Sequence, residues 1–439
     1  MKQARWSALL PILVFLVLYL GMGIVFEYIM GISMGFYNIP IVVVFVIALM
    51  VACAQNRELK LDEKLAVMGR GVGDKIMMTM ILIFLLAGIF VGVVGRSSAE
   101  SVAFLFLDII PPQFAVAVLF LVACLVSISM GTSVGTITVL TPIAVSISLA
   151  SGFSMPLCIG SVMGGAMFGD NLSFISDTTI AACQGQGCEM KDKFRENFKI
   201  ALPAALVCLV LIVVVSLSAG ITEVQIGEYN LIQTLPYLLV LVLGIVGVNV
   251  FIVLIVGIVT GAVVMLATGA SDVIGLLGGM GAGASGMFET TMVAILVAAI
   301  CALVREYGGF EALLAWIKRT FKSRKGGQLG MGLLVGLMDI STANNTVAII
   351  MANPIAADMA KTYGISKRKT ASILDTFSCV FQGIIPYGAQ MLVALSAAAT
   401  LGFEVSAFDV MPFLFYPYML LISSLVFIFF DRAKKSGAK

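Results

Sequence analysis

The chain has 439 residues, of which 60% are hydrophobic and 11% are charged, and its formal net charge is +2. Soluble domains carry about 25% charged residues, so this composition, with a mean hydropathy of +1.10, excludes an ordinary soluble domain and indicates an integral membrane protein. This hydrophobic composition makes the lipid bilayer the expected partner, and the near-neutral charge gives no reason to expect nucleic acid.

Apolar windows long enough to cross a bilayer, ~20 residues, recur along the whole chain. They lie at Ala8–Tyr28, Ile39–Ala54, Ile76–Gly95, Phe198–Ser218, Met287–Val304 and Val410–Phe430. Leu231–Ala267 is too long for one span, and we predict two helices that separate at Gly247–Asn249. The glycine-rich run Gly278–Gly286 lacks the ending of a phosphate loop and predicts either a flexible outer connection or a close helix approach.

Four further apolar segments are interrupted by small and polar residues, and they occur in matching places in the two halves. Segments 113–150 and 329–360 turn near Ser127–Thr136 and Asp339–Thr346, and we predict re-entrant hairpins. Segments 155–183 and 371–400 are predicted to be interrupted helices. Irregular backbone at membrane depth is tolerated where protein or a water-filled cavity covers it. The alternative is ordinary hydrogen bonding between helices by Ser, Thr and Asn.

The positions of Lys and Arg along the chain predict its orientation in the membrane. All the basic residues except Arg96 fall in six patches, which the positive-inside rule places in the cytoplasm: Lys2–Arg5, Arg57–Lys75, Lys191–Lys199, Arg305–Lys325, Lys361–Lys369 and Arg432–Lys439. Both termini are then cytoplasmic, and residues 1–220 and 221–439 follow the same plan with opposite orientation. The predicted fold is an all-α integral membrane protein with two inverted-topology repeats, each with a re-entrant hairpin and a discontinuous transmembrane helix, an organisation typical of secondary transporters.

The interrupted helices hold carboxylates that no basic residue within the predicted spans balances. Asp170, Asp177, Asp339, Asp375 and Glu289 form this acidic set, and the chain has no histidine. Such acids are either protonated or hold a cation, and a site that alternates between the two conditions is a cation/proton exchanger. Asp339 also suits a solvated cap at the inner start of its hairpin, and Glu289 suits the N-terminus of a helix.

The run Gly169–Thr179, G-D-N-L-S-F-I-S-D-T-T, resembles the signature of the NhaC family of Na⁺/H⁺ antiporters, in which G-D-x-x-S-P-x-S-D-T-T is typical. Phe174 stands where that family has Pro, so the interruption is expected to be shallower or to rest on Gly169 and Asn171 alone. The resemblance implies membership of the ion-transporter superfamily, whose members are usually homodimers with a transport part that moves like an elevator.

The resemblance and the polar tips together define the expected site residues. In the first half they are Thr132, Ser133, Thr136, Asp170, Asn171, Ser173, Ser176, Asp177, Thr178 and Thr179. In the second half they are Ser341, Thr342, Asn344, Asn345, Thr346, Asp375, Pro386 and Gln390.

The predicted function is exchange of Na⁺ for H⁺ across the cell membrane, with Na⁺ and H⁺ as transported ions and no cofactor. Asp177 is expected to be the first Na⁺ ligand, supported by Thr178 and Thr179, and Asp170 the partner that titrates. The alternative is a Na⁺- or H⁺-coupled transporter or exchanger of a small organic acid or amino acid, because Asn344 and Asn345 at a hairpin tip suit a carboxylate. An enzyme or a channel is disfavoured, because the chain has no nucleophile–base constellation and a channel does not need two inverted halves.

Overall fold

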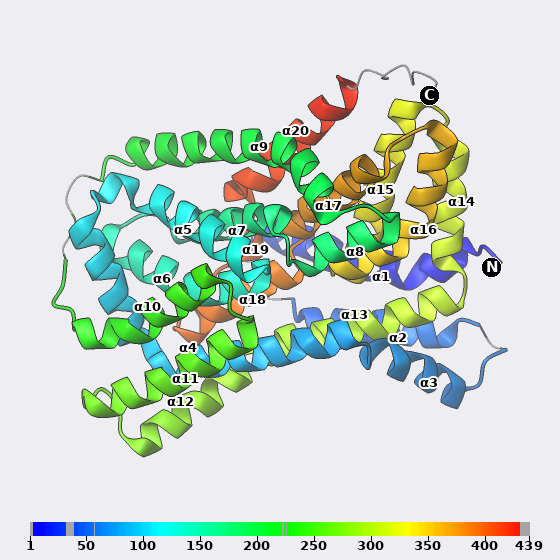
Figure 1. Ribbon diagram of the computed structural model, residues 1–439. Coiled ribbons are helices and arrows are strands. Elements are labelled where there is room, and N and C mark those ends of the chain that lie inside the picture. Colours follow the sequence, from blue (N-terminus) through cyan, green and yellow to red (C-terminus); the bar gives the residue numbers. More distant parts are fainter. Residues whose placement is uncertain (1–2, 32–38, 57, 222–223, 225, 431–439) are drawn as a thin grey trace.

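The computed structural model describes residues 3–31, 39–56, 58–221, 224 and 226–430, and within these ranges it is helical without strands (Figure 1). The predicted patches Lys2–Arg5, Arg57–Lys75 and Arg432–Lys439 lie partly or wholly outside the described residues. Within the described residues, eight helices are long and apolar enough to cross a membrane, or nine if the bent pair Ala407–Phe413 and Phe415–Phe429 is one span. The prediction of an all-α membrane protein is confirmed.

The part of the first half that the structure describes contains nine α-helices. They are α1 (Leu10–Ile24), α2 (Ile41–Ala54), α3 (Leu61–Val72), α4 (Lys75–Ile109), α5 (Ala115–Met130), α6 (Ser133–Ser151), α7 (Met155–Leu172), α8 (Asp177–Gln186) and α9 (Met190–Ser218). Short turns of other helix types lie at Trp6–Leu9, Val25–Ile29 and Pro112–Phe114. The hairpin is α5–α6 and the broken helix is α7–α8, as predicted.

The second half repeats this order. Its helices are α10 (Leu231–Val246), α11 (Val250–Ala267), α12 (Val273–Gly286), α13 (Phe288–Glu306), α14 (Gly309–Thr320), α15 (Arg324–Thr342), α16 (Asn345–Tyr363), α17 (Lys367–Ile384), α18 (Ala389–Thr400), α19 (Ala407–Val410) and α20 (Phe415–Phe429), with a 3₁₀ turn at Met411–Phe413. The hairpin is α15–α16 and the broken helix is α17–α18.

The hairpins and broken helices of the two repeats align with each other at a constant offset in the sequence. Helix α16 begins 212 residues after α6 (345 − 133), α17 begins 212 residues after α7 (367 − 155), and α18 begins 212 residues after α8 (389 − 177). The ends of α6 and α16, and of α7 and α17, have the same separation. From the end of α5 to the start of α8, residues at equal places in the two repeats are therefore related by a constant shift of 212.

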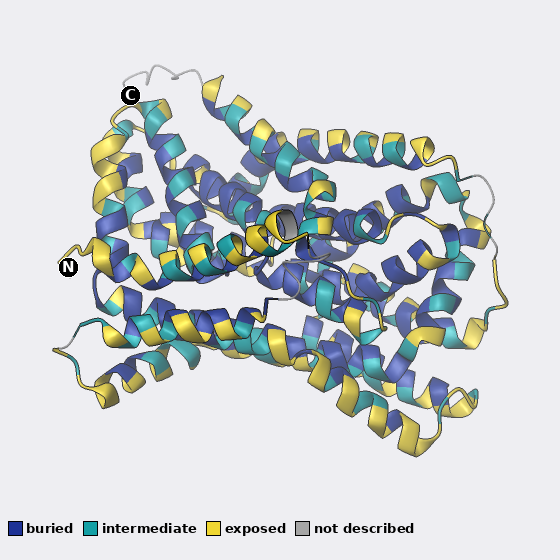
Figure 2. Ribbon diagram, turned by 180° about the vertical axis from the view of Figure 1, so that it is seen from behind, coloured by how far each residue is buried: buried dark blue, intermediate teal, exposed yellow. Residues whose placement is uncertain are grey.

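The two repeats pack into each other through the second parts of their broken helices. Helix α8 of the first repeat packs against α16 and α17, whereas α18 of the second repeat packs against α6. Accordingly, Met391 and Val393 belong to the hydrophobic core built around α5, α6 and α7, and Ala182 belongs to the core built around α15, α16 and α17. Figure 2 shows buried residues through the centre and exposed ones along the outer helices.

Two elements differ from the sequence prediction. Helix α4 does not end near Gly95 but continues to Ile109, with a kink at Gly95, which has φ +60° and ψ −170°. The glycine-rich run Gly278–Gly286 is helical and makes a close helix approach, the second of its two predicted forms. A Cβ on Gly88 or Gly92 of α4 would collide with the backbone of Gly283 or Gly279, so these glycines allow α4 and α12 to touch through their main chains.

Candidate functional site

Both hairpin tips and both helix breaks open into one cavity, which we call the ion cavity. Its volume is about 70 Å³, and its polar lining comes from both repeats and from α4. The polar residues that line it are Thr79, Thr132, Ser133, Asp170, Ser176, Asp177, Thr178, Asn344, Asn345, Thr346, Gln382 and Gln390. Because the two repeats interlock, residues more than 200 positions apart in the sequence face the same small space.

The two hairpin tips share one construction. The C-cap residue directly after α5 is Gly131, which has φ +68°, and the one directly after α15 is Ala343, which has φ +47°. The next residue caps the following helix in both tips: Thr132 Oγ1 accepts from the amide of Gly135, and Asn344 Oδ1 accepts from the amide of Val347. Each tip thus presents the N-terminus of a helix to the ion cavity.

The first helix break lies at residues 173–176, between α7 and α8. Helix α7 continues through Gly169 and Asn171, so the expectation that the break rests on these two residues is wrong, and the expectation of a shallower break stays a prediction. Phe174 stacks on Phe194 with a centroid distance of 4.6 Å. A Cβ on Gly131 would lie 2.6 Å from Cγ1 of Ile175, so the break packs directly on the first hairpin tip.

Asp170 is the buried carboxylate that lines the ion cavity. Its side chain is 7% exposed, Ser133 Oγ donates to its Oδ2 at 2.8 Å, and Ser176 Oγ donates to its Oδ1. Ser176 Oγ also lies 2.7 Å from Thr178 Oγ1. The carboxylate is therefore held by hydroxyl groups from the tip of the first hairpin and from the first break.

Hydrogen bonds extend this cluster into the second repeat. Gln390 Nε2 donates to Ser133 Oγ at 3.1 Å, and Gln382 Nε2 donates to Gln390 Oε1 at 2.7 Å and to the carbonyl of Ala343 at 3.1 Å. Gln382 stands 212 residues after Asp170 (382 − 170), so the second repeat places an amide where the first places a carboxylate.

Asp177 lies at the edge of the ion cavity and is exposed, unlike Asp170. It is the first residue of α8, where a negative charge suits the positive end of the helix dipole. The structure thus separates the two acids of the motif into a buried one and an accessible one.

Several other predicted site residues do not line the ion cavity. Asn171 donates to Cys379 Sγ and Tyr416 Oη, Thr136 donates to the carbonyl of Thr132, and Ser173 Oγ accepts from the amide of Ile175. Ser341 donates to the carbonyl of Leu337, Thr342 donates to the carbonyl of Asn344, and Pro386 lines a different cavity, beside Glu289.

Asp375 also lies outside the ion cavity, and the expectation that no basic residue balances the acids is wrong. Lys193 Nζ lies 2.7 Å from Asp375 Oδ2, and both side chains are 1% exposed. Lys193 Nζ also donates to Thr179 Oγ1 at 2.6 Å, so the hydroxyl of Thr179 faces Lys193 and does not line the ion cavity. The predicted cytoplasmic patch Lys191–Lys199 therefore contributes one buried lysine.

The two remaining acids of the predicted set differ from each other. Asp339 is fully buried, and neither of its carboxylate oxygens has a hydrogen-bond partner among the described residues. The prediction that Asp339 is a solvated cap at the start of its hairpin is therefore wrong. Glu289 lies in the first turn of α13, which agrees with its interpretation as an acid at the N-terminus of a helix.

Comparison with known proteins identifies the family. The model of the Na⁺/H⁺ antiporter family matches residues 3–221 and, a second time, residues 219–431. The chain belongs to this family. It is 23% identical over 390 residues to the Na⁺/H⁺ antiporter NhaC of Alkalihalophilus pseudofirmus, covering 81% of this chain and 82% of that one. The resemblance based on Gly169–Thr179 is confirmed.

Two further relatives complete the comparison. The chain is 20% identical over 379 residues to the malate-2H⁺/Na⁺-lactate antiporter of Bacillus subtilis, covering 79% of this chain and 80% of that one. The crystal structure of the Alcanivorax borkumensis YdaH transporter aligns with a TM-score of 0.45 at 14% identity, covering 88% of this chain and 95% of that one.

Four residues that line the ion cavity or contact Asp375 were not predicted from the sequence of this antiporter-family member. Gln382 and Thr79 line the ion cavity, and Lys193 and Asn197 hold Asp375. Gln382 falls just before the predicted second break, in the run that also contains Gln390, and a comparison of the repeats at a shift of 212 residues would have paired it with Asp170. Thr79, Lys193 and Asn197 carry no local signal, because their partners come from distant helices.

Proposed function

We propose that this protein exchanges Na⁺ for H⁺ at Asp170. The observation that carries the proposal is a buried carboxylate in a small cavity, whose only hydrogen-bond partners among the described residues are the hydroxyls of Ser133 and Ser176. Hard cations prefer oxygen ligands, and carboxylate, hydroxyl and amide oxygens surround this space. A volume of about 70 Å³ is well below the roughly 300–1,000 Å³ of typical small-molecule sites.

The exchange follows from competition for the same oxygens. When Asp170 is ionised, the serine hydroxyls turn their oxygen lone pairs toward a bound Na⁺, because a hydroxyl both donates and accepts. When a proton binds Asp170, the negative charge that holds Na⁺ is lost, and the ion leaves. Burial makes Asp170 the first ligand in this proposal, and the exposed Asp177 receives Na⁺ at the edge of the cavity, the reverse of the order expected from the sequence.

We further propose alternating access by an elevator-type movement. The hairpins and broken helices form the part that carries the cavity, and α8 and α18 lock the two repeats into one body. Helices α10, α11 and α12 present large apolar residues outward, including Val246 at 74% and Ile274 at 81% exposure, as surfaces that face lipid or a second copy do. Cytoplasmic termini and a homodimer remain the predicted orientation and assembly.

The test is Na⁺-driven proton movement in proteoliposomes. Asp170→Asn keeps the size of the side chain and removes its charge, so exchange should fall to the level of empty liposomes, whereas Asp177→Asn should raise the KM for Na⁺ and retain measurable exchange. The matched control is Asp108→Asn, an exposed acid in the last turn of α4, which should behave as the wild type. Full exchange by Asp170→Asn would refute the assignment.

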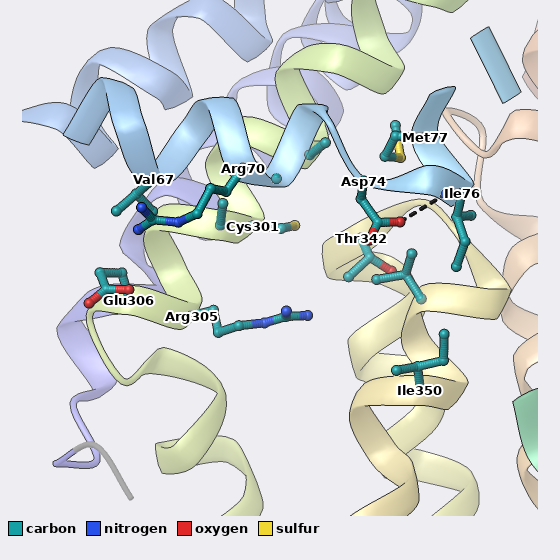
Figure 3. Close-up of a pocket in the computed structure, with 14 residues that line it drawn as sticks. Val67, Arg70, Asp74, Ile76, Met77, Cys301, Arg305, Glu306, Thr342 and Ile350 are labelled. Atoms are coloured by element: carbon teal, nitrogen blue, oxygen red, sulfur yellow. Dashed lines mark hydrogen bonds between the residues drawn. The ribbon is translucent and has the colours of Figure 1, made fainter. Parts of the chain in front are cut away.

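A second cavity supports one alternative function. A pocket of about 260 Å³ opens between α3, α4, α13 and the second hairpin, and it shares Ile76 with the ion cavity. Arg70 and Arg305 line it, and Arg305 extends from α13 toward the helix that carries Ile350 (Figure 3). Guanidinium groups bind carboxylates, although Asp74 and Glu306 line the same pocket.

This pocket, together with the similarity to the Bacillus malate/lactate antiporter, makes exchange of a small organic acid the second candidate. Proteoliposomes loaded with malate and given radiolabelled lactate in a Na⁺ gradient provide the test. Lactate uptake that Arg305→Gln abolishes would favour the second candidate. Na⁺/H⁺ exchange at full rate without either acid, and no lactate uptake, would exclude it.

A further inference from the structure

Lys193 is a buried lysine whose ammonium lies among oxygen atoms of two repeats. It sits in the first turn of α9, is 1% exposed, and pairs with Asp375 of α17 at 2.7 Å. Its Nζ also donates to the carbonyl of Asn171 at 3.0 Å and to Thr179 Oγ1 at 2.6 Å. We call these three oxygens, Asn171 O, Thr179 Oγ1 and Asp375 Oδ2, the lysine cage.

The lysine cage joins both sides of the first helix break. Asn171 belongs to the last turn of α7, before the break, and Thr179 belongs to the first turn of α8, after it. The carbonyl of Asn171 is one of those that a helix end leaves without an intrahelical partner, and a cation suits that end of the dipole. Asn197 donates to the same Asn171 carbonyl at 3.0 Å and to Asp375 Oδ2 at 2.6 Å, so two adjacent turns of α9 hold the break.

The ligands of the lysine cage are those of a monovalent cation site. One carboxylate, one hydroxyl and one backbone carbonyl are hard oxygen donors. Asp170, one residue before Asn171, offers a similar set of carboxylate and hydroxyl oxygens on the other side of the same turn, without a basic partner among the described residues. The first break therefore carries two oxygen cages, and a covalently tethered cation fills one of them.

The repeat symmetry argues that a helix break closes without the carboxylate of this cage. A shift of 212 residues relates Asp375 of α17 to Met163 of α7 (375 − 163), which is buried and apolar. The second break thus closes without a carboxylate at the place that Asp375 takes beside the first break. The lysine cage lies at the first break, next to Asp170.

We propose that Lys193 acts as a tethered cation that occupies a second potential Na⁺ site, so that only the Asp170 site remains exchangeable. Resting on the proposed function, this inference makes Lys193 a positioning and stoichiometry-determining residue. Its ammonium fixes the backbone of the break that carries Asp170, and its charge excludes a second Na⁺. Removal of the ammonium leaves Asp375 Oδ2, Thr179 Oγ1 and Asn171 O as an open cation cage.

The experiment measures how many Na⁺ ions bind per chain, with radioactive Na⁺ and the purified full-length protein. We expect one Na⁺ for the wild type and for Lys193→Arg, two for Lys193→Ala, and one again for the double variant Lys193→Ala/Asp375→Asn. The matched control is Lys64→Ala, because Lys64 is also buried but, among the described residues, its ammonium donates to the backbone carbonyls of Cys53 and Gln55 and to no carboxylate. Its Na⁺ count should equal that of the wild type.

Each outcome supports or overturns the inference. A folded Lys193→Ala variant with one Na⁺ per chain overturns it, because a purely structural lysine would leave the count unchanged. Lys193→Ala is also purified in a buffer in which choline replaces Na⁺, and there it can fail to fold. Recovery of folded protein in Na⁺ buffer but not in choline buffer then supports the inference, and no recovery in either buffer overturns it. A wild type that binds no Na⁺ refutes the proposed function. In that case, a Lys193→Ala variant that binds one Na⁺ still supports the inference that the lysine occupies a cation site.

Discussion

Gly169 provides a sharp test of how packing controls the Asp170 site. It lies on the face of α7 that touches α5, one residue before Asp170. A Cβ at this position would lie 2.5 Å from the Cβ of Ser127, 2.6 Å from the amide nitrogen of Ile128 and 2.7 Å from the carbonyl oxygen of Cys124. Two of these neighbours are backbone atoms, so rotation of a side chain does not relieve the collision.

The size of the effect follows from these distances. Non-bonded carbon atoms prefer separations of about 3.5–4.0 Å, so in Gly169→Ala helix α7 has to move away from α5 by roughly 1 Å. Overpacking of this kind typically costs about 1–3 kcal/mol of stability. A displacement of about 1 Å at a reacting group can lower a rate about 100-fold, a factor that corresponds to about 2.8 kcal/mol. We therefore expect Gly169→Ala to weaken the use of Na⁺ by a free energy comparable with its loss of stability.

The assay compares thermal unfolding in detergent with the Na⁺ concentration dependence of exchange in proteoliposomes. The matched control is Gly278→Ala in α12, where no atom lies within 4 Å of the added Cβ, and this variant should equal or exceed the wild type in stability. Gly169→Ala with the melting temperature and the KM for Na⁺ of the wild type would refute the packing of α7 on α5.

Three further predictions address the protons, the second tip and the surface. If protons and Na⁺ compete at Asp170, the KM for Na⁺ should rise by up to about tenfold per pH unit as the pH falls, and a KM that is constant across the pH range contradicts competition. Ala343 has φ +47°, a conformation that costs an L-residue about 1–2 kcal/mol and glycine little. Ala343→Gly should therefore raise the melting temperature, and a lower one would show that the Ala343 methyl contributes packing that outweighs the strain. Lys318 and Asp358 form an ion pair with side chains 45% and 58% exposed, and Lys318→Ala should change stability by less than about 1 kcal/mol, so a larger loss in thermal unfolding would contradict the surface assignment.

The helices, hairpins and breaks were predictable because polar residues stand out against an apolar background. Proline, glycine and hydroxyl residues placed both hairpin tips and both breaks in the right segments, and the paired acids of Gly169–Thr179 marked the segment that contains the first break. The bounds of α4 and α9 were less accurate. Gly95 kinks α4 without ending it, and α9 begins within a basic run that looked purely cytoplasmic.

The pairing of buried charges was not predictable from the sequence. Lys193 looked like one member of a basic patch, because a local rule assigns lysines near helix ends to the cytoplasmic surface. Its partners, Asn171, Thr179 and Asp375, lie up to 182 positions away (375 − 193) and meet it only in the folded protein. Asp339 was equally ambiguous, because its burial depends on how α15 packs against α17.

The most direct test of the central claim is the number of protons released when Na⁺ binds. Isothermal titration of the purified protein with Na⁺, in buffers of different ionisation enthalpy, measures this number at a chosen pH. The proposal predicts that the wild type releases protons on Na⁺ binding, approaching one per Na⁺ at low pH, and that Asp170→Asn neither binds Na⁺ nor releases protons. Na⁺ binding without proton release in the wild type at every pH, or unchanged proton release in Asp170→Asn, would contradict exchange at Asp170.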